Sequence, residues 1–170
     1  GQFERRHYVA GYDSDLAWTD SELGRLIDWL KATSNNDTVL VVTGDHGESM
    51  TDHDRYFCHG SLYEHDIHVP MVVWGPNVAA QHVDLRTAHV DVLPTLLDYA
   101  GVGSLPGFAG ASLRPLLEGG TVARPPFTLS VVGRAENLRY AVVGEGGKKA
   151  IVDRHGALLE AYDIAADPLE

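Results

Sequence analysis

Residues 38–48 read TVLVVTGDHGE, an apolar and β-branched run that leads into an Asp-His pair between two glycines. The apolar part does not alternate with polar residues, which predicts a fully buried strand of a parallel sheet. Ligands of open α/β sheets collect outside the carboxyl ends of the strands, and Asp45 and His46 come at that place. Gly44 and Gly47 permit the sharp turn through which two adjacent side chains could reach one ion.

The segments around this strand alternate between helix and strand. Apolar residues recur at spacings of three, four and seven over 7–32, which predicts a helix. Residues 69–74 form a second apolar run, and 91–100 predict a helix with Asp91 as its N-cap and Gly101 just past its end. The order of helix, strand, long loop, strand and helix is that of an α/β fold.

The sequence changes character at about residue 121, where TVARPP resembles a linker. Four short candidate strands follow, with glycines in the turns between them. They cover 127–132, 138–143, 149–153 and 158–163. We therefore expect an α/β part over 1–120 and a small antiparallel sheet over 121–170.

The composition excludes several classes of protein. The 170 residues include 13 Lys and Arg against 24 Asp and Glu, which gives a formal net charge of −11. Such an acidic surface repels phosphate backbones, so no nucleic-acid partner is expected. No apolar run approaches the ~20 residues that span a bilayer, and no signal peptide is recognisable. The single cysteine, Cys58, excludes an intrachain disulfide.

The segment 44–70 holds five of the nine histidines and carries the candidate chemistry. Asp45 and His46 offer a carboxylate and an imidazole, which are good ligands for a divalent metal, although an ordinary loop pair is an equal alternative. His59 could bind the same ion or donate to an anionic substrate oxygen, with a core or surface histidine as the alternative. His65 and His68 flank the next strand and could line a cleft or serve the structure.

Three other residues of this segment favour plainer interpretations. His53 stands between acidic residues and is expected in an exposed loop. Glu48 is compatible with a contact behind the metal ligands or with an ordinary loop carboxylate. Cys58 fits a small buried thiol better than a nucleophile, because no third group is identifiable to orient the neighbouring histidine. A structural zinc pattern would need a second cysteine.

Seven stretches resemble, in order, the C-terminal part of the sulfatase-like hydrolases of the alkaline phosphatase superfamily. They are DSELGRLIDWL at 20–30, VVTGDHGE at 41–48, HGSLYE at 59–64, VPMVVWGP at 69–76, HVDVLPTLLDYAGV at 89–102, GASLRPLLEG at 110–119 and YDIAADPLE at 162–170. Each stretch is weakly specific alone, but the ordered set covers nearly the whole chain. The resemblance implies part of a sulfatase-like or alkaline-phosphatase-like α/β sandwich with a small C-terminal antiparallel sheet.

The resemblance also implies roles for matching residues. Asp45 and His46 resemble the late pair of ligands to the active-site metal, a divalent ion such as calcium, zinc or manganese. His59 stands where many sulfatases have a lysine that contacts the sulfate and where sulfatase-like phosphotransferases often have histidine. We therefore expect His59 to be catalytic and substrate-binding, and His68 to bind substrate as well.

The family's nucleophile has no counterpart in this sequence, since Cys58 is followed by His-Gly-Ser and not by the Pro and Arg of the family motif. We therefore expect a fragment that is inactive by itself. Its N-terminal remainder would carry the first acidic metal ligands and the nucleophile, either a formylglycine or an unmodified threonine.

The complete protein is thus expected to be a metal-dependent sulfuric or phosphoric ester hydrolase. A phosphoethanolamine or phosphoglycerol transferase, a non-catalytic metal-binding scaffold domain and a structural zinc protein are the alternatives. The expected partners are the ester substrate, the N-terminal remainder and further copies of the chain. The family resemblance favours a periplasmic, membrane-anchored or extracellular-facing location.

Overall fold

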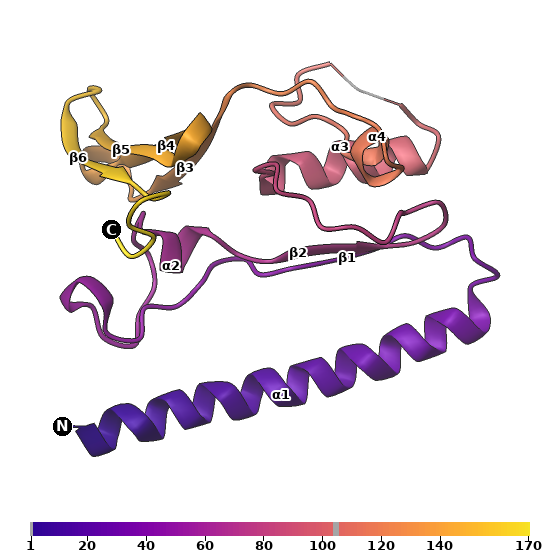
Figure 1. Cartoon of the computed structure of the whole chain (residues 1–170), viewed down its shortest axis with the longest axis horizontal. Helices are drawn as coiled ribbons and strands as arrows, with labels where there is room; N and C mark the ends of the chain where they lie inside the picture. The colour runs from indigo at the N-terminus through magenta and orange to yellow at the C-terminus, as the bar shows by residue number, and fades with distance from the viewer. Residues whose placement is uncertain (1, 104–105) are drawn as a thin grey trace.

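The computed structural model describes residues 2–103 and 106–170 and contains a long helix and two sheets (Figure 1). The helices are α1 (Gln2–Thr33), α2 (Glu64–Ile67), α3 (Val92–Tyr99) and α4 (Arg114–Leu117), with 3₁₀ turns η1 (Asp52–Asp54), η2 (His89–Asp91), η3 (Ala135–Asn137) and η4 (Glu145–Gly147). The strands are β1 (Leu40–Thr43), β2 (Met71–Trp74), β3 (Phe127–Val132), β4 (Arg139–Gly144), β5 (Lys148–Asp153) and β6 (Leu158–Asp163). The α/β fold class is confirmed, with both helices and sheets in one chain.

Helix α1 confirms the predicted N-terminal helix and runs along one side of the molecule (Figure 1). Several of its large apolar side chains are exposed to solvent, with Trp18 68% and Trp29 60% exposed. The ring of Tyr8 stacks on Phe57 with centroids 4.5 Å apart, which joins the start of α1 to the segment after η1. Within the ranges 2–103 and 106–170, no helix combines the length and the apolar character needed to cross a membrane.

The pairing of β1 with β2 shows that the prediction of a fully buried parallel strand is wrong. The two strands are antiparallel, with Leu40 opposite Trp74 and Thr43 opposite Met71. Thr43 is exposed, and Val72 on the partner strand is 58% exposed. A continuous apolar run indicates that both faces of a strand are apolar, but the direction of pairing is decided by the connecting loop, which here turns back on the strand.

The four C-terminal strands confirm the predicted antiparallel sheet. They are paired in the order β3-β4-β5-β6, each strand antiparallel to the next. Burial alternates along β4 and β5, so that Ala141, Val143 and Ile151 are at most 3% exposed. This period of two is the pattern of a sheet with one face packed on a core.

The core lies where this sheet meets the segment around α2. Leu62 packs against Ala141 and Ile151, and four partly buried side chains surround the three. Those four are Tyr63, Ile67, Val132 and Tyr162. The loop that follows the Asp-His pair is therefore anchored by apolar packing against the C-terminal sheet.

Asp91 begins the α3 region as predicted, but its carboxylate does not cap the first turn of α3. It accepts hydrogen bonds from the backbone N–H groups of Ala88 and Ala111, at 2.8 and 2.9 Å. It also pairs with Arg124 at 2.5 Å, and both side chains are at least nine-tenths buried. A buried carboxylate needs such partners, and tertiary contacts supply them in place of the local cap.

Candidate functional site

Asp45 and His46 lie together just after the carboxyl end of β1, which confirms the predicted arrangement. The Nε2 atom of His46 is 3.7 Å from Oδ2 of Asp45. The backbone N–H of His46 donates to Oδ1 of Asp45 at 3.0 Å, and this contact, together with the nearby imidazole, lowers the pKa of the Asp45 carboxyl. The carboxylate therefore stays ionised and is open to solvent.

The ring of His46 is oriented by its own turn. Its Nδ1 atom lies 2.8 Å from the carbonyl oxygen of Gly47. A carbonyl only accepts hydrogen bonds, so Nδ1 carries the proton, and Nε2 of the neutral ring presents its lone pair beside Asp45. The contact with Gly47 raises the pKa of His46, and burial opposes this shift. This tautomer suits a metal ligand, whose other ring nitrogen is held by a carbonyl or carboxylate.

The two glycines of the turn do not adopt a left-handed conformation, since neither Gly44 nor Gly47 has a positive φ. Their lack of a side chain instead lets neighbouring backbone come close to the turn. A Cβ added at Gly47 would lie 1.9 Å from the carbonyl oxygen of His65, and the N–H of Gly47 donates to the carbonyl of Asp66 at 2.8 Å. The turn is thus packed directly against α2. His89 holds its other side, with Nε2 2.8 Å from the Gly44 carbonyl.

His59 joins the pair from a distant point of the same loop. Its ring stacks on His46 with centroids 3.9 Å apart and an interplanar angle of 26°. Its Nδ1 atom faces Oε2 of Glu48 at 3.4 Å. Glu48 therefore contacts His59, and its other oxygen, Oε1, is buried without a hydrogen-bond partner among the described residues.

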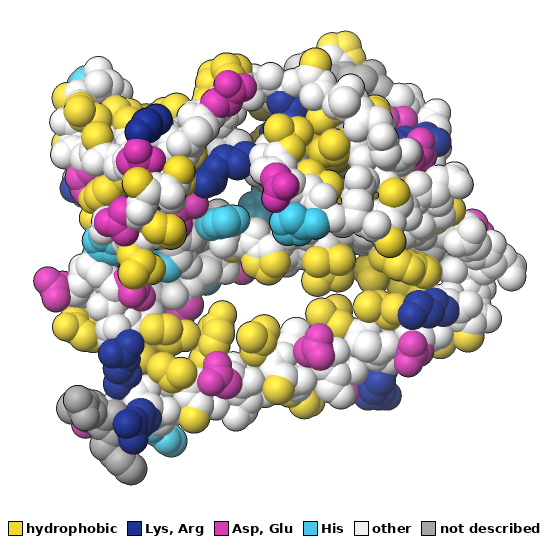
Figure 2. All heavy atoms as spheres, viewed as in Figure 1, with side chains coloured by type: hydrophobic (Ala, Val, Ile, Leu, Met, Phe, Trp, Pro, Cys, Tyr) yellow, Lys and Arg dark blue, Asp and Glu magenta, His cyan; other side chains and the backbone are white. Residues whose placement is uncertain are grey.

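Asp45, His46 and His59 border a hollow of about 1070 Å³, whose lining also includes residues of β2, of the loop before η2 and of β3. Figure 2 shows histidine side chains gathered beside this hollowed part of the face. His68 lines the same hollow and is 70% exposed, but its Nδ1 atom faces Glu64 at 3.5 Å. The structure thus brings Asp45, His46 and His59 together and places His68 on the same wall through a separate contact.

The remaining histidines of the loop serve the packing. His53 is half-buried between exposed acidic residues of its loop. Its ring stacks on Tyr63 with centroids 3.7 Å apart, and its Nε2 lies 3.0 Å from the Leu169 carbonyl oxygen. Nε2 of His65 faces both Ser61, at 3.5 Å, and Asp66, at 3.6 Å. Because one nitrogen makes both contacts, the group lacks the geometry of a Ser-His-Asp triad.

The interpretation of Cys58 as a structural residue is compatible with its place beside the site, although the side chain is only partly buried. Its backbone bridges to Ser49, whose residue is fully buried. This bridge closes the loop between Glu48 and His59 and brings their side chains within reach of each other.

Sequence reasoning missed three residues that shape this site, namely Glu64, Arg86 and His89. Each acts across a long stretch of chain: Arg86 pairs with Glu64 at 3.3 Å, and His89 contacts the turn 45 residues before it. Arg86 follows β2 in a segment without regular structure and His89 begins the short turn η2, so no periodicity in the sequence indicates their contacts. The only signal was their position inside or next to the family stretch that begins at residue 89.

The donor set fits two positions of a divalent metal site. A carboxylate oxygen and an imidazole nitrogen with a free lone pair are suitable ligands for zinc or manganese. Over residues 2–103 and 106–170, no group of three or more His, Cys, Asp or Glu side chains is arranged to hold an ion. Asp45 and His46 therefore fit as part of a ligand shell that needs further donors.

Comparisons with known proteins identify the family of the chain. The sequence profile of the family called Sulfatase matches residues 1–102. The chain is 34% identical to arylsulfatase K of Mus musculus over 98% of this chain and 32% of that protein. It is 33% identical to the Delta 4,5-hexuronate-2-O-sulfatase of Bacteroides thetaiotaomicron over 97% of this chain and 36% of that protein.

Among solved structures, the chain is similar to a protein determined in complex with its substrate D-glucosamine-2-N,6-O-disulfate. The TM-score is 0.76 at 26% identity, and the match covers 88% of this chain and 32% of that one. The chain thus spans about a third of the length of the curated relatives it matches. Since the profile covers more than half of its residues, the chain belongs to the sulfatase family.

Proposed function

We propose that the protein hydrolyses sulfate esters with the help of a divalent metal, and that Asp45, His46 and His59 belong to its active site. One observation carries this proposal: three residues from two parts of a loop meet at the end of β1, beside a hollow large enough for a ligand. Family membership supports the reaction class. Asp45 and His46 would act as metal ligands and His59 as a proton donor.

A divalent ion held by Asp45 and His46 would neutralise charge on the ester oxygens. Asp45 and His46 would present their ligand atoms to the ion without a change of conformation. The carbonyl of Gly47 holds the Nδ1 proton of His46, so Nε2 is available. The Asp45 carboxyl, whose pKa is lowered by the neighbouring N–H and imidazole, is ionised at neutral pH.

His59 would hold a proton toward the leaving oxygen of the ester. Its Nδ1 atom faces the Glu48 carboxylate, so in the protonated ring Nε2–H is the group left to donate. A nucleophile, expected from the N-terminal remainder, would bond to sulfur as the sulfur–oxygen bond to the leaving group breaks. Negative charge then develops on the leaving oxygen, which takes the proton from His59, and a donor there typically contributes 10²–10⁴-fold to the rate. Glu48 would orient the ring during this transfer.

We propose a sulfated sugar as the substrate class. Two similar proteins support this: one is named a hexuronate-2-O-sulfatase, and the other was determined with a disulfated glucosamine. Phosphate esters, which the sequence left open, are the competing class. Transition-metal loading is expected over calcium, because an imidazole belongs to the ligand set.

The test is hydrolysis of 4-nitrophenyl sulfate and of 4-nitrophenyl phosphate by the natural full-length chain after zinc, manganese or calcium loading. We expect faster turnover of the sulfate. Asp45→Asn should lower kcat/KM about 10³-fold, because a metal ligand supports several kcal/mol of transition-state stabilisation. The matched control is Asp84→Asn, a 96% exposed carboxylate on the same hollow, which should stay near wild type. Equal losses in both variants, or preference for the phosphate, would contradict the proposal.

A further inference from the structure

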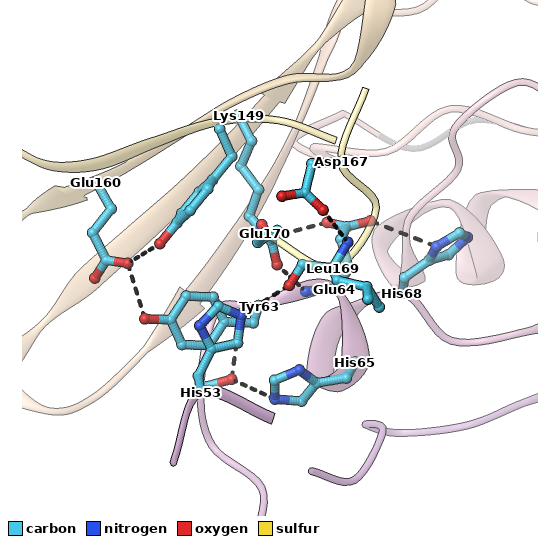
Figure 3. Close-up of polar contacts among 12 residues, drawn as sticks. His53, Tyr63, Glu64, His65, His68, Lys149, Glu160, Asp167, Leu169 and Glu170 are labelled. Carbon is cyan, nitrogen blue, oxygen red and sulfur yellow. Dashed lines mark hydrogen bonds and ion pairs between the residues drawn. The ribbon is translucent and has the colours of Figure 1, made fainter. Parts of the chain in front are cut away.

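Glu64 stands at the centre of a cluster of charges between α2 and the C-terminal sheet (Figure 3). Its Oε1 atom accepts a hydrogen bond from Nζ of Lys149 at 3.1 Å. Its Oε2 atom accepts from a terminal nitrogen of Arg86 at 3.3 Å and lies 3.5 Å from Nδ1 of His68. One carboxylate therefore contacts a buried ammonium group with one oxygen, and a more exposed guanidinium and imidazole with the other.

Lys149 fixes Glu64 in this position. Its side chain is fully buried and also pairs with Glu170 at 2.6 Å. The backbone N–H of Glu64 donates to the other oxygen of Glu170 at 2.7 Å. Burial by itself would raise the pKa of Glu64, but the contacts with Lys149 and Arg86 outweigh it and lower the pKa. Glu64 is thus held as an anion at a defined place.

Arg86 and His68 both line the hollow that Asp45, His46 and His59 border. The Arg86 side chain is 38% exposed, and the described hydrogen bonds use only one of its terminal nitrogens. A guanidinium has five N–H donors in a fixed fork, so most of them are free to bind a second anion. Because Arg86 and His68 contact the same oxygen of Glu64, both lie within reach of one carboxylate or sulfate.

We propose that Arg86 and His68 form a second anion-binding subsite on the wall of this hollow, with Glu64 as the residue that positions them. Its ligand is an anionic substituent of the substrate, a carboxylate or a second sulfate, distinct from the ester that is cleaved. This inference rests on the proposed function for the identity of the substrate, but the subsite itself can be measured independently of turnover.

The test compares two aryl sulfates on the natural full-length chain: 4-nitrophenyl sulfate, and 4-carboxyphenyl sulfate, which carries a second anion. Arg86→Gln should raise KM for the carboxylated ester about tenfold, the value of one lost charge-assisted hydrogen bond, and change KM for the other less than about twofold. Glu64→Gln should likewise raise KM for the carboxylated ester and not for 4-nitrophenyl sulfate. Glu64→Asp, which keeps the charge, should raise it less. Arg154→Gln is the matched control, because Arg154 is 39% exposed and pairs with a glutamate away from the hollow.

An equal change of KM for both esters, or no change in Arg86→Gln, would overturn the subsite. If the wild-type chain cleaves neither ester, the proposed function fails, and calorimetry with 4-hydroxybenzoate then decides the subsite alone. Binding about tenfold weaker in Arg86→Gln than in wild type would support it. Equal binding would overturn it. Glu64→Gln leaves Lys149 short of a counter-ion, so its folding is checked by thermal unfolding, and Arg86→Gln keeps the test valid if that variant unfolds.

Discussion

The loop of residues 44–70 and the four-stranded sheet of residues 127–163 are built in opposite ways. The loop has little regular structure beyond one short turn and a four-residue helix, and it carries the candidate chemistry. The sheet is a continuous antiparallel ladder with a buried face. The comparison teaches that reactive groups here depend on side-chain and backbone contacts across the fold, while the sheet is specified by its own alternation.

Polar contacts join the two regions (Figure 3), in addition to the small apolar core. Tyr63 of the loop donates to Glu160 of the sheet at 2.9 Å, and Tyr162 donates to the same carboxylate at 2.5 Å. Lys149 of the sheet reaches Glu64 of the loop. The sheet thus serves as the support on which the loop is held.

The largest effect is expected where the two regions join. Lys149→Met should lower the free energy of unfolding by about 3–5 kcal/mol, because it removes the buried cation of Glu170 and leaves Glu64 with Arg86 alone. Lys148→Met is a matched control on the next residue, since Lys148 is 70% exposed in its pair with Asp163. It should cost less than about 1 kcal/mol. Urea unfolding of the natural full-length chain measures both, and equal losses would refute the role of the buried pair.

A core substitution within the sheet should lower the free energy of unfolding and leave the rate of hydrolysis nearly unchanged. Ile151→Ala removes a side chain that is 3% exposed and should destabilise the protein by about 2–4 kcal/mol. Turnover of 4-nitrophenyl sulfate below the unfolding temperature should change less than about twofold. Val72→Ala, at a 58% exposed strand position, should lie within about 0.5 kcal/mol of wild type. A large loss of turnover in Ile151→Ala would show that the sheet and the site are not separable.

A substitution in the loop should lower the reaction rate without lowering stability. Glu48→Gln removes the charge that faces His59 and should lower kcat about tenfold, close to 1.4 kcal/mol, while KM and the free energy of unfolding change little. Glu118→Gln is a control of similar exposure, 32% against 25%, that pairs with Arg114. Steady-state kinetics and urea unfolding distinguish them. An unchanged kcat in Glu48→Gln would remove its proposed role.

The smallest expected effect concerns pH. The hydrogen bonds from Tyr162 and Tyr63 lower the pKa of Glu160 below its ordinary value of 4.5, against the opposing effect of burial. A carboxyl with a lowered pKa stabilises the fold above its ordinary pKa, and this contribution is lost as the pH falls through the lowered value. Glu160→Gln should therefore be less stable than wild type by up to about 1 kcal/mol at pH 7 and approach it below pH 4.5. A difference that grows toward acid would contradict this sign.

Much of the fold follows from local pattern. The alternating residues and glycine turns after residue 126 predict all four C-terminal strands, and the spacing of apolar residues predicts α1. The Gly-Asp-His-Gly turn after an apolar run predicts where Asp45 and His46 meet. These features are determined within a few residues of chain, where side-chain period and turn chemistry act directly.

Tertiary structure decided the rest. The antiparallel pairing of β1 with β2, the stacking of His59 on His46, and the contacts of Glu64 with Arg86 and Lys149 all join residues separated by long loops. Such contacts depend on loop closure and on burial of charges against partners that no local pattern names. The sequence by itself therefore determined the turn that carries Asp45 and His46, and only the folded chain determined which side chains surround it.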